Sequence, residues 1–426
     1  MENKKEFKVN DVETLPEGWK RVKLGEIIVE NPKSPFKVED ANDEGFFPFF
    51  TSGEVVLKHN HLLVDGENIF LSTGGSAYVK FHTGKASYSA DTWVIRIKNS
   101  VLGNKLFYYF LQRKINHITY KYFIGSGLEH LQKDYFKSNF IVVFPESSKE
   151  QKKIAEILET VDKAIEKTDA IIEKYKRIKH GLMHDLLTKG IDENRQTRSE
   201  QTHKFKDSPL GRIPKEWEVV TVSDFASNEK NAIVDGPFGS NLKIEHYREV
   251  GRPVVQSGFV TSNKFVADKY LYVDESKFRS EIRSRVLPGD IVMAKIGAQC
   301  GTCAILPDNH PIGILAGNCL KITVSRNNLN KFLEILLHYY YKLGKLELVI
   351  STTAQPAISM SSLKKVLIPR PNIMEQHRIA QVLYQIDETI EKEIQYKEKL
   401  ERLKIGLMED LLTGKVRVNN LIKEGV

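Results

Sequence analysis

The segment Glu150-Gln151-Lys152-Lys153-Ile154-Ala155 is repeated 225 residues later as Glu375-Gln376-His377-Arg378-Ile379-Ala380. The register then holds without a gap to residues 181–188 and 406–413, where the pattern Gly-Leu-Met-x-Asp-Leu-Leu-Thr ends both copies. Over the whole stretch 20 of 39 positions are identical, which is far beyond chance. The chain therefore contains an internal duplication, and this repeat organises the rest of the sequence.

Both copies predict a long amphipathic helix. Apolar residues recur at alternating spacings of four and three, no proline interrupts either segment, and Lys and Glu crowd the other positions. Such a helix is a rod of roughly 58 Å, too long for the inside of one globular core. Each apolar stripe needs an apolar partner, so we expect the copies to pair as an antiparallel coiled coil; two ordinary core helices are the alternative. The residues expected at the helix-pair interface are Ile154, Leu158, Val161, Ile165, Ile172, Leu182, Leu186, Ile379, Leu383, Ile386, Ile390, Leu400, Leu407 and Leu411.

The sequence before each helix is repeated more weakly. Leu15-Pro16-Glu17-Gly18-Trp19 matches Ile213-Pro214-Lys215-Glu216-Trp217, and Pro48-Phe49-Phe50-Thr51-Ser52-Gly53 matches Pro253-Val254-Val255-Gln256-Ser257-Gly258. The offsets between matches drift, so the intervening loops differ in length. A duplicated scaffold whose two copies bind different targets would show this pattern.

The chain is predicted to be α/β (α+β), with two globular domains that each precede a long helix and a pseudo-two-fold relation between the halves. Short Val, Ile, Phe and Tyr runs between Gly-rich turns predict largely antiparallel or mixed sheets. A length of 426 residues exceeds one ordinary core. The predicted boundaries are 1–148 for the first globular domain, 149–188 for the first helix, 189–208 for a polar linker, 209–372 for the second globular domain, 373–414 for the second helix and 415–426 for a C-terminal tail.

The net charge of +8 is unevenly distributed. The repeated segments 150–188 and 375–413 carry 0 and −3, which leaves +11 on the remainder. A positive excess confined to the globular parts favours a polyanion partner, although a merely Lys-rich protein is the plain alternative. Three cysteines, no long apolar run and no apolar stretch at the N-terminus lead us to expect a cytoplasmic protein.

No motif of an enzyme is recognisable, so we expect no catalytic residue and no cofactor bound by this chain. A phosphate-binding loop needs Gly-x4-Gly-Lys-Ser/Thr, and neither Gly84-Lys85 nor Gly414-Lys415 fits it. No Asn/Asp-Pro-Pro-aromatic motif of an amino-methyltransferase is present. A nuclease site at Asp290 and Lys295 is conceivable, but these residue types are too common for the pair to be specific.

Three cysteines and a histidine in the second half resemble a zinc site at first sight: Cys300, Cys303, His310 and Cys319. Their neighbours Ala304-Ile305-Leu306 are apolar, and the first half of the chain has no cysteine. Small buried strand residues are therefore the preferred interpretation, and we expect no metal.

Polar loops that follow predicted strands are candidates for contact with DNA. Reading bases requires directed donors and acceptors, whereas Lys and Arg on phosphates set position. Ser72 to Lys80 forms such a loop in the first half, and Lys295 to Gln299 occupies the corresponding place in the second. For any one residue, a solvated turn is as good an explanation. The candidate DNA contacts are Thr51, Ser52, Ser72, Thr73, Ser76, Tyr78, Lys80, His82, Lys85, Tyr88, Ser126, Gln256, Ser257, Lys295, Gln299, Thr302, Thr352, Thr353 and Gln355.

These features together resemble the specificity (S) subunit of Type I restriction–modification systems, along essentially the whole chain. The paired helices carry the resemblance, together with the junction Phe205-Lys206-Asp207-Ser208-Pro209-Leu210-Gly211-Arg212-Ile213-Pro214. The resemblance implies that each globular part is a target-recognition domain reading half of a bipartite double-stranded DNA site. It also implies two methyltransferase (M) subunits carrying S-adenosylmethionine, and optionally two restriction (R) subunits using ATP and Mg²⁺.

In that arrangement the antiparallel helix pair would set the spacing between the readers and dock the methyltransferase subunits on its outward faces, near Met183 and Met408. Groove spacing along a duplex makes such a fixed separation useful. Two other classes stay open. One is a catalytically active restriction or methyltransferase polypeptide, and the other is a purely structural coiled-coil scaffold.

Overall fold

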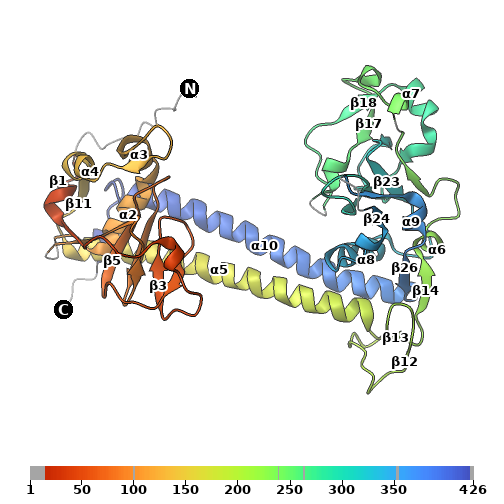
Figure 1. Ribbon diagram of the computed structural model, residues 1–426, viewed down its shortest axis with the longest axis horizontal. Coiled ribbons are helices and arrows are strands. Elements are labelled where there is room, and N and C mark those ends of the chain that lie inside the picture. Colours follow the sequence, from red (N-terminus) through yellow and green to blue (C-terminus); the bar gives the residue numbers. More distant parts are fainter. Residues whose placement is uncertain (1–14, 99–100, 238, 262–263, 352–354, 423–426) are drawn as a thin grey trace. The chain divides into compact units, whose positions relative to one another are not determined.

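The computed structural model describes residues 15–98, 101–237, 239–261, 264–351 and 355–422 (Figure 1). It divides into two compact units. Unit 1 consists of residues 1–171 and 393–426, and unit 2 consists of residues 172–392. Each long helix therefore contributes one part to each unit. Within the described ranges, no helix is both long enough and apolar enough to span a membrane.

Unit 1 contains short strands and helices in addition to its share of the long helices. Their bounds are β1 (Trp19–Lys23), α1 (Leu24–Ile27), β2 (Ile28–Glu30), η1 (Val38–Asp40), β3 (Phe47–Phe50), β4 (Leu57–His59), β5 (Glu67–Ser72), β6 (Val79–Thr83), β7 (Ser87–Tyr88), β8 (Thr92–Ile97), α2 (Asn104–Arg113), α3 (Ile115–Tyr122), β9 (Phe123–Ile124), β10 (His130–Leu131), α4 (Lys133–Asn139), β11 (Ile141–Pro145) and η7 (Asn419–Leu421). An antiparallel sheet has the order β2-β8-β5-β6, and a mixed sheet has the order β4-β3-β7 with β3 parallel to β7.

Unit 2 repeats this plan with longer loops. Its elements are β12 (Phe205–Lys206), β13 (Ile213–Pro214), β14 (Glu218–Thr221), α6 (Val222–Phe225), β15 (Ile233–Asp235), η2 (Gly239–Asn241), η3 (Ile244–His246), β16 (Tyr247–Arg248), β17 (Arg252–Val255), η4 (Ser257–Val260), β18 (Leu271–Val273), α7 (Glu275–Ser280), η5 (Ile282–Ser284), β19 (Arg285–Val286), β20 (Ile291–Ala294), β21 (Cys303–Ile305), β22 (Gly313–Leu315), β23 (Cys319–Ile322), α8 (Asn330–Lys342), η6 (Glu347–Val349), β24 (Ile350–Ser351), β25 (Ala357–Ile358), α9 (Met360–Lys364) and β26 (Leu367–Arg370). The order β15-β23-β20-β21 is the counterpart of β2-β8-β5-β6, and β17 runs parallel to β22 as β3 does to β7. The predicted mixture of antiparallel and mixed sheets is confirmed.

The long helices are α5 (Ser148–Thr188) and α10 (Ile373–Leu411), which run alongside each other (Figure 1). In unit 1, Asp162 and Asp169 of α5 pair with Lys404 and Lys397 of α10 at 2.7 and 2.8 Å. In unit 2, Lys179 of α5 pairs with Asp387 of α10. Along these ion pairs the residue numbers rise on α5 as they fall on α10, so the predicted antiparallel pairing is present in each unit.

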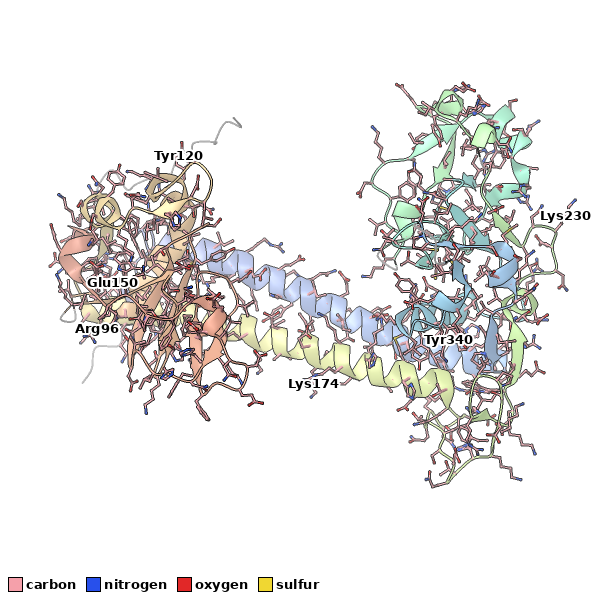
Figure 2. The ribbon with its side chains drawn as sticks, viewed as in Figure 1. Arg96, Tyr120, Glu150, Lys174, Lys230 and Tyr340 are labelled. Carbon is pink, nitrogen blue, oxygen red and sulfur yellow. The ribbon has the colours of Figure 1, made fainter. Side chains whose placement is uncertain are left out.

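Each unit has a core into which both long helices insert. In unit 1 the aromatic core around Phe107 and Tyr122 takes Ile154 and Leu158 from α5, Met408 and Leu411 from α10, and Leu412 from directly after α10. In unit 2 the core around Trp217 and Phe332 takes Met183, Leu186 and Leu187 from α5 and Ile379 and Leu383 from α10. In Figure 2, Glu150 lies inside unit 1 and Tyr340 inside unit 2.

The predicted interface residues differ in burial. Val161, Ile172 and Leu400 are buried like those in the cores, whereas five others are only partly buried: Ile165, Leu182, Ile386, Ile390 and Leu407. Away from the cores, only one face of each helix is covered by the other. A two-helix seam leaves the edges of each stripe accessible, because a coiled-coil contact covers a narrower arc than a globular core does.

The segments after the long helices are packed rather than loose, unlike the linker and tail that their polar composition predicted. Ile191 and Arg198 are buried in unit 2, and Val418 is buried in unit 1. Ile191 and Val418 join the apolar cores of their units, and Arg198 and Arg417 each pair with a buried carboxylate at the start of the opposite helix.

Candidate nucleic-acid interface

In unit 1, four polar segments meet at the end of β5. The carbonyl oxygen of Asp91, just before β8, accepts hydrogen bonds from the Thr73 amide (3.0 Å) and hydroxyl (2.8 Å), and from the Ser52 hydroxyl. The Gly75 amide donates to the carbonyl oxygen of Glu129 in the β9–β10 loop (2.9 Å). Four loops of different sequence origin are thereby fixed to one another.

Unit 2 contains the same arrangement with different side chains. The Lys295 amide donates to the carbonyl oxygen of Asn318, just before β23 (2.8 Å), and the Gly297 amide donates to that of Pro356 (2.9 Å). The Asn318 amide Nδ2 donates to Ser257 Oγ at 2.7 Å. Position by position, Thr73 corresponds to Lys295, Gly75 to Gly297, Asp91 to Asn318 and Ser52 to Ser257. We call these two sets the reading loops: residues 51–53, 73–78, 91 and 125–129 in unit 1, and 256–258, 295–299, 318 and 355–356 in unit 2.

Many of the candidate DNA contacts have accessible side chains in or beside the reading loops. Ser76, Tyr78, Lys85, Ser126, Gln299 and Gln355 are exposed. Ser52, Thr73, Lys80, His82, Gln256, Ser257 and Lys295 are partly buried. Thr352 and Thr353 lie outside the described residues.

Four candidates are buried, and their side chains hold loops instead of facing solvent. Ser72 Oγ donates to the carbonyl oxygen of Ser76 (2.7 Å) and accepts from the Tyr78 amide (2.8 Å). The Tyr88 hydroxyl donates to the carbonyl oxygen of Pro32 (2.7 Å), and burial raises the pKa of this phenol. Thr302 Oγ1 donates to the carbonyl oxygen of Gln299 (2.8 Å), and Thr51 Oγ1 accepts from the Gly53 amide (3.3 Å). Thr51, Ser72, Tyr88 and Thr302 therefore have a structural task in these loops, as expected for hydroxyl side chains in turns, which bond readily to nearby backbone, and their contact with DNA stays a prediction.

Two candidate lysines act inside the protein. Lys80 Nζ donates to the carbonyl oxygens of Thr51 and Gly53, and burial lowers the pKa of this ammonium group although Glu54 opposes the shift. Lys295 Nζ bonds Asp235 at 2.7 Å, and Arg283 bonds the other carboxylate oxygen at 3.0 Å. Both lysines stabilise the reading loops, and in unit 2 Lys295 shares the Asp235 carboxylate with Arg283.

Asp91 and Asn318, which are exposed at the centre of the reading loops, were not among the predicted DNA contacts. Each is the residue directly before an apolar strand, Thr92-Trp93-Val94-Ile95 or Cys319-Leu320-Lys321-Ile322. A polar residue at the same place in both repeats is the signal that would have found them. It was hidden because the flanking sequences share no motif.

The cysteines do not form a ligand set. Among the described residues, no group of three or more His, Cys, Asp or Glu side chains is placed to hold a metal ion. Cys300 Sγ contacts the carbonyl oxygen of Lys295 at 3.0 Å, and Cys319 Sγ contacts that of Val255 at 3.5 Å. Burial raises the pKa of all three thiols, most strongly for Cys303 and Cys319.

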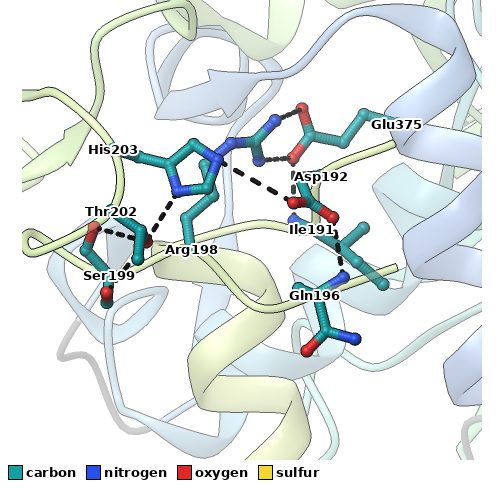
Figure 3. Close-up of polar contacts among 8 residues, drawn as sticks. All are labelled: Ile191, Asp192, Gln196, Arg198, Ser199, Thr202, His203 and Glu375. Carbon is teal, nitrogen blue, oxygen red and sulfur yellow. Dashed lines mark hydrogen bonds and ion pairs between the residues drawn. The ribbon is translucent and has the colours of Figure 1, made fainter. Parts of the chain in front are cut away.

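The repeated Glu-Gln pair explains how the long helices are held at their ends. Glu375 is 1% exposed and pairs with Arg198, and the Ile191 amide (3.0 Å) also donates to it (Figure 3). Trp217 Nε1 is a further donor to Glu375, at 3.1 Å. In unit 1, Glu150 is likewise 1% exposed and pairs with Arg417 at 2.7 and 2.9 Å. We call these pairs latches, since each joins the start of one long helix to the segment after the other.

The glutamines next to the latches tie the long helices to the globular parts. Gln151 accepts from the Gly103 amide (3.1 Å), which caps α2, and donates to the carbonyl oxygen of Pro145 (2.9 Å). Gln376 accepts from the Leu329 amide (2.8 Å), which caps α8, and donates to the carbonyl oxygen of Pro371 (2.9 Å). Both members of the repeated Glu-Gln pair therefore have the same structural task in each unit.

The architecture defines a class of protein: two copies of one α/β unit, each with its own reading loops and joined by a pair of helices. The chain matches the model of the Type I restriction modification DNA specificity domain over residues 16–176 and 214–402, and it belongs to this family. Family membership assigns the chain a role in DNA specificity.

Individual relatives cover nearly the whole chain. The Type I restriction enzyme MjaVIII specificity subunit of Methanocaldococcus jannaschii is 29% identical over 96% of this chain and 95% of its own length. The EcoDI specificity subunit of Escherichia coli is 25% identical over 89% and 84%. Among solved structures, the S subunit of the Type I system from M. genitalium aligns with a TM-score of 0.61 at 15% identity, over 92% of this chain and 96% of that one, and shares the fold.

Proposed function

We propose that this chain is the DNA-recognition subunit of a Type I restriction–modification complex, in which unit 1 reads one half of a bipartite target and unit 2 reads the other. The observation that carries the proposal is the duplication of the reading loops with different side chains. Backbone hydrogen bonds are repeated at equivalent positions, whereas Thr73 is replaced by Lys295 and Asp91 by Asn318. A common frame with unlike side chains is what two different half-sites require.

The chemistry of the complex belongs to other subunits in this proposal. Two methyltransferase subunits would supply S-adenosylmethionine, and restriction subunits, where present, would use ATP and Mg²⁺. The chain itself would bind DNA without catalysis and work in the cytoplasm. The excess of +11 charges outside the repeated helical segments supports attraction to phosphates, although the partners would add contacts of their own.

The methyltransferase subunits would dock on the outward faces of the long helices near their Met183 and Met408 ends, through neighbouring residues and not through the two methionine side chains. Met183 and Met408 are 5% and 7% exposed and belong to the cores of their units. Leu403 and Ile405 of α10 are accessible instead, at 50% and 68% exposure. Ile405 also lines a groove of unit 1 with a volume of about 1160 Å³, and Tyr78 and Thr119 are among the other residues that line it. Apolar side chains exposed on a helix favour a protein partner.

Methylation mapping tests this proposal. Genomic DNA from cells that express the chain with its methyltransferase subunit should carry methylated bases in one bipartite motif. Gln299→Ala or Gln355→Ala should weaken or relax the motif in the unit 2 half-site alone. Equal loss in both half-sites, or a motif without two separated parts, contradicts the proposal.

Electrophoretic mobility shift separates the proposal from the other two classes. The recognition-subunit proposal predicts weak binding by the chain alone and sequence-specific binding together with its methyltransferase partner. Methyl transfer by the isolated chain would favour an enzyme, and no DNA binding in either form would favour a purely structural coiled coil.

A further inference from the structure

Asp91 and Asn318 occupy equivalent positions at the centre of the two sets of reading loops. Each has its backbone carbonyl oxygen bonded to the loop after the neighbouring strand, through the amide of Thr73 (3.0 Å) or Lys295 (2.8 Å). In unit 1 the hydroxyls of Thr73 and Ser52 bond the same oxygen. The carbonyl oxygen thus accepts three hydrogen bonds at Asp91 and one at Asn318, while both side chains are exposed. A side chain on a fixed backbone is well suited to recognition, because its position needs little further ordering.

Among the described residues, the Asp91 carboxylate has no contact that would explain the presence of an aspartate at this position. Other loop aspartates in this chain bond backbone amides nearby: Asp224 accepts from the Thr221 amide at 2.8 Å, and Asp274 from the Lys277 amide at 2.8 Å. Within the part of the chain that the structure describes, the Asp91 carboxylate has neither a hydrogen-bond nor an ion-pair partner. An exposed, unpaired carboxylate on a surface that faces phosphates weakens binding unless it meets a donor.

Asn318 has the same place but different hydrogen-bonding chemistry. Its Nδ2 donates to Ser257 Oγ at 2.7 Å, and its Oδ1 accepts a long contact from Cys319 Sγ at 3.6 Å. These contacts orient the amide plane and leave one N–H and one lone pair of Oδ1 for a ligand. A carboxylate only accepts hydrogen bonds, whereas a carboxamide both donates and accepts. In the major groove, an aspartate suits the exocyclic amine of cytosine, and an asparagine suits the N6 and N7 edge of adenine.

We propose that Asp91 and Asn318 are specificity-determining residues that each read one base edge in the half-site of their own unit. Asp91 accepts from an exocyclic amine, with cytosine as the best match, and Asn318 makes paired hydrogen bonds to an adenine. The inference rests on the proposed function, since it requires that the reading loops face DNA. It assigns part of the difference between the half-sites to one position of the repeated frame.

The test uses the full chain assembled with its methyltransferase subunit and a DNA library randomised over the wild-type target. Asp91→Asn and Asn318→Asp preserve shape and leave the backbone hydrogen bonds intact, and Asp91→Ala removes the reading group. Glu146→Gln makes the same change of charge as Asp91→Asn at an exposed position before α5 and serves as its control. Each reading variant should change the base preference by about 5- to 150-fold at one position of one half-site. Asp91→Asn and Asp91→Ala should affect one half-site, and Asn318→Asp the other.

The outcomes separate this inference from the proposed function. If the wild-type complex selects no bipartite sequence, the proposed function fails. If the wild type selects one but Asp91→Asn and Asn318→Asp retain every base preference and change only overall affinity, as Glu146→Gln does, this inference is overturned. A reading variant that still assembles but loses preference evenly along the whole target also contradicts it.

Discussion

Removing the carboxylate of Glu375 should destabilise unit 2 by more than removing that of Glu150 destabilises unit 1. Glu375 accepts from the Arg198 guanidinium, the Ile191 amide and Trp217 Nε1, and all three are buried. Glu375→Ala therefore leaves a buried cation and two buried N–H groups without a partner. Breaking a buried ion pair from one side costs about 3–5 kcal/mol.

Glu150 occupies the same place in the repeat, but its hydrogen-bond partners are fewer and more exposed than those of Glu375. Its partner Arg417 has a side chain that is 31% exposed, so water can replace the lost hydrogen bonds. Trp19 Nε1, the counterpart of the Trp217 donor, is buried and has no hydrogen-bond partner among the described residues. Loss of hydrogen bonds to a charged group that water can reach gives an expected cost of about 1.5–3 kcal/mol for Glu150→Ala.

Hydrogen exchange read by mass spectrometry measures the two effects separately, because peptides from each unit report that unit's opening free energy. Glu375→Ala should lower protection most in unit 2, and Glu150→Ala should lower it less and mainly in unit 1. Glu398→Ala, at an exposed position of α10, is the control and should change neither unit. A cost for Glu375→Ala that is no greater than that for Glu150→Ala would refute the reasoning.

Three further predictions concern single side chains. Gly190→Ala should strongly destabilise unit 2 in thermal unfolding, because φ is +73° and a Cβ would lie 2.5 Å from Trp217. Gly181→Ala lies on α5 with no other atom near its Cβ, so it should stabilise unit 2 by up to about 1 kcal/mol. The reverse order of stabilities would contradict the packing described. Lys85→Ala should reduce the salt dependence of DNA binding by about one unit of slope in a binding titration and leave the selected motif unchanged; an altered motif would instead make Lys85 a base contact. The hydrogen bond from Arg113 holds the pKa of Glu409 below its usual value of 4.5, although partial burial opposes this shift. The pair therefore stabilises unit 1 above pH 4.5, and this stabilisation is lost as the pH falls through the lowered pKa of Glu409. The stability difference between the wild type and Glu409→Gln should therefore shrink in acid denaturation, and a difference that grows in acid would exclude this explanation.

The helices were predictable because their signal is local and repeated. The 4-3 spacing and the register at an offset of 225 residues placed both helices to within a few residues, and the apolar stripes led to the antiparallel pairing. The second helix ends earlier than predicted, at Leu411 instead of 414. Gly414 adopts a φ of +72° close to Trp19, and the composition of the helix does not reveal that contact.

The latches and the roles of single loop residues were not predictable. Glu150 and Glu375 are recognisable as a repeat, but their partners Arg417 and Arg198 lie 267 and 177 residues away in segments that do not align. In the loops, composition indicates a polar surface without telling which hydroxyls turn inward. Ser72 and Thr302 bond backbone atoms within six residues, whereas Ser76 and Gln299 in the same loops are exposed.

The central claim is that each unit contacts its own half of a bipartite target, and site-specific photo-crosslinking tests it most directly. A photoreactive amino acid is placed at Ser126 or at Gln355, both exposed in the reading loops, within the complex assembled on its DNA target. We expect the probe at 126 to crosslink bases of one half-site only and the probe at 355 to crosslink bases of the other. Crosslinks from both positions to the same half-site, or crosslinks confined to the spacer, would contradict the account.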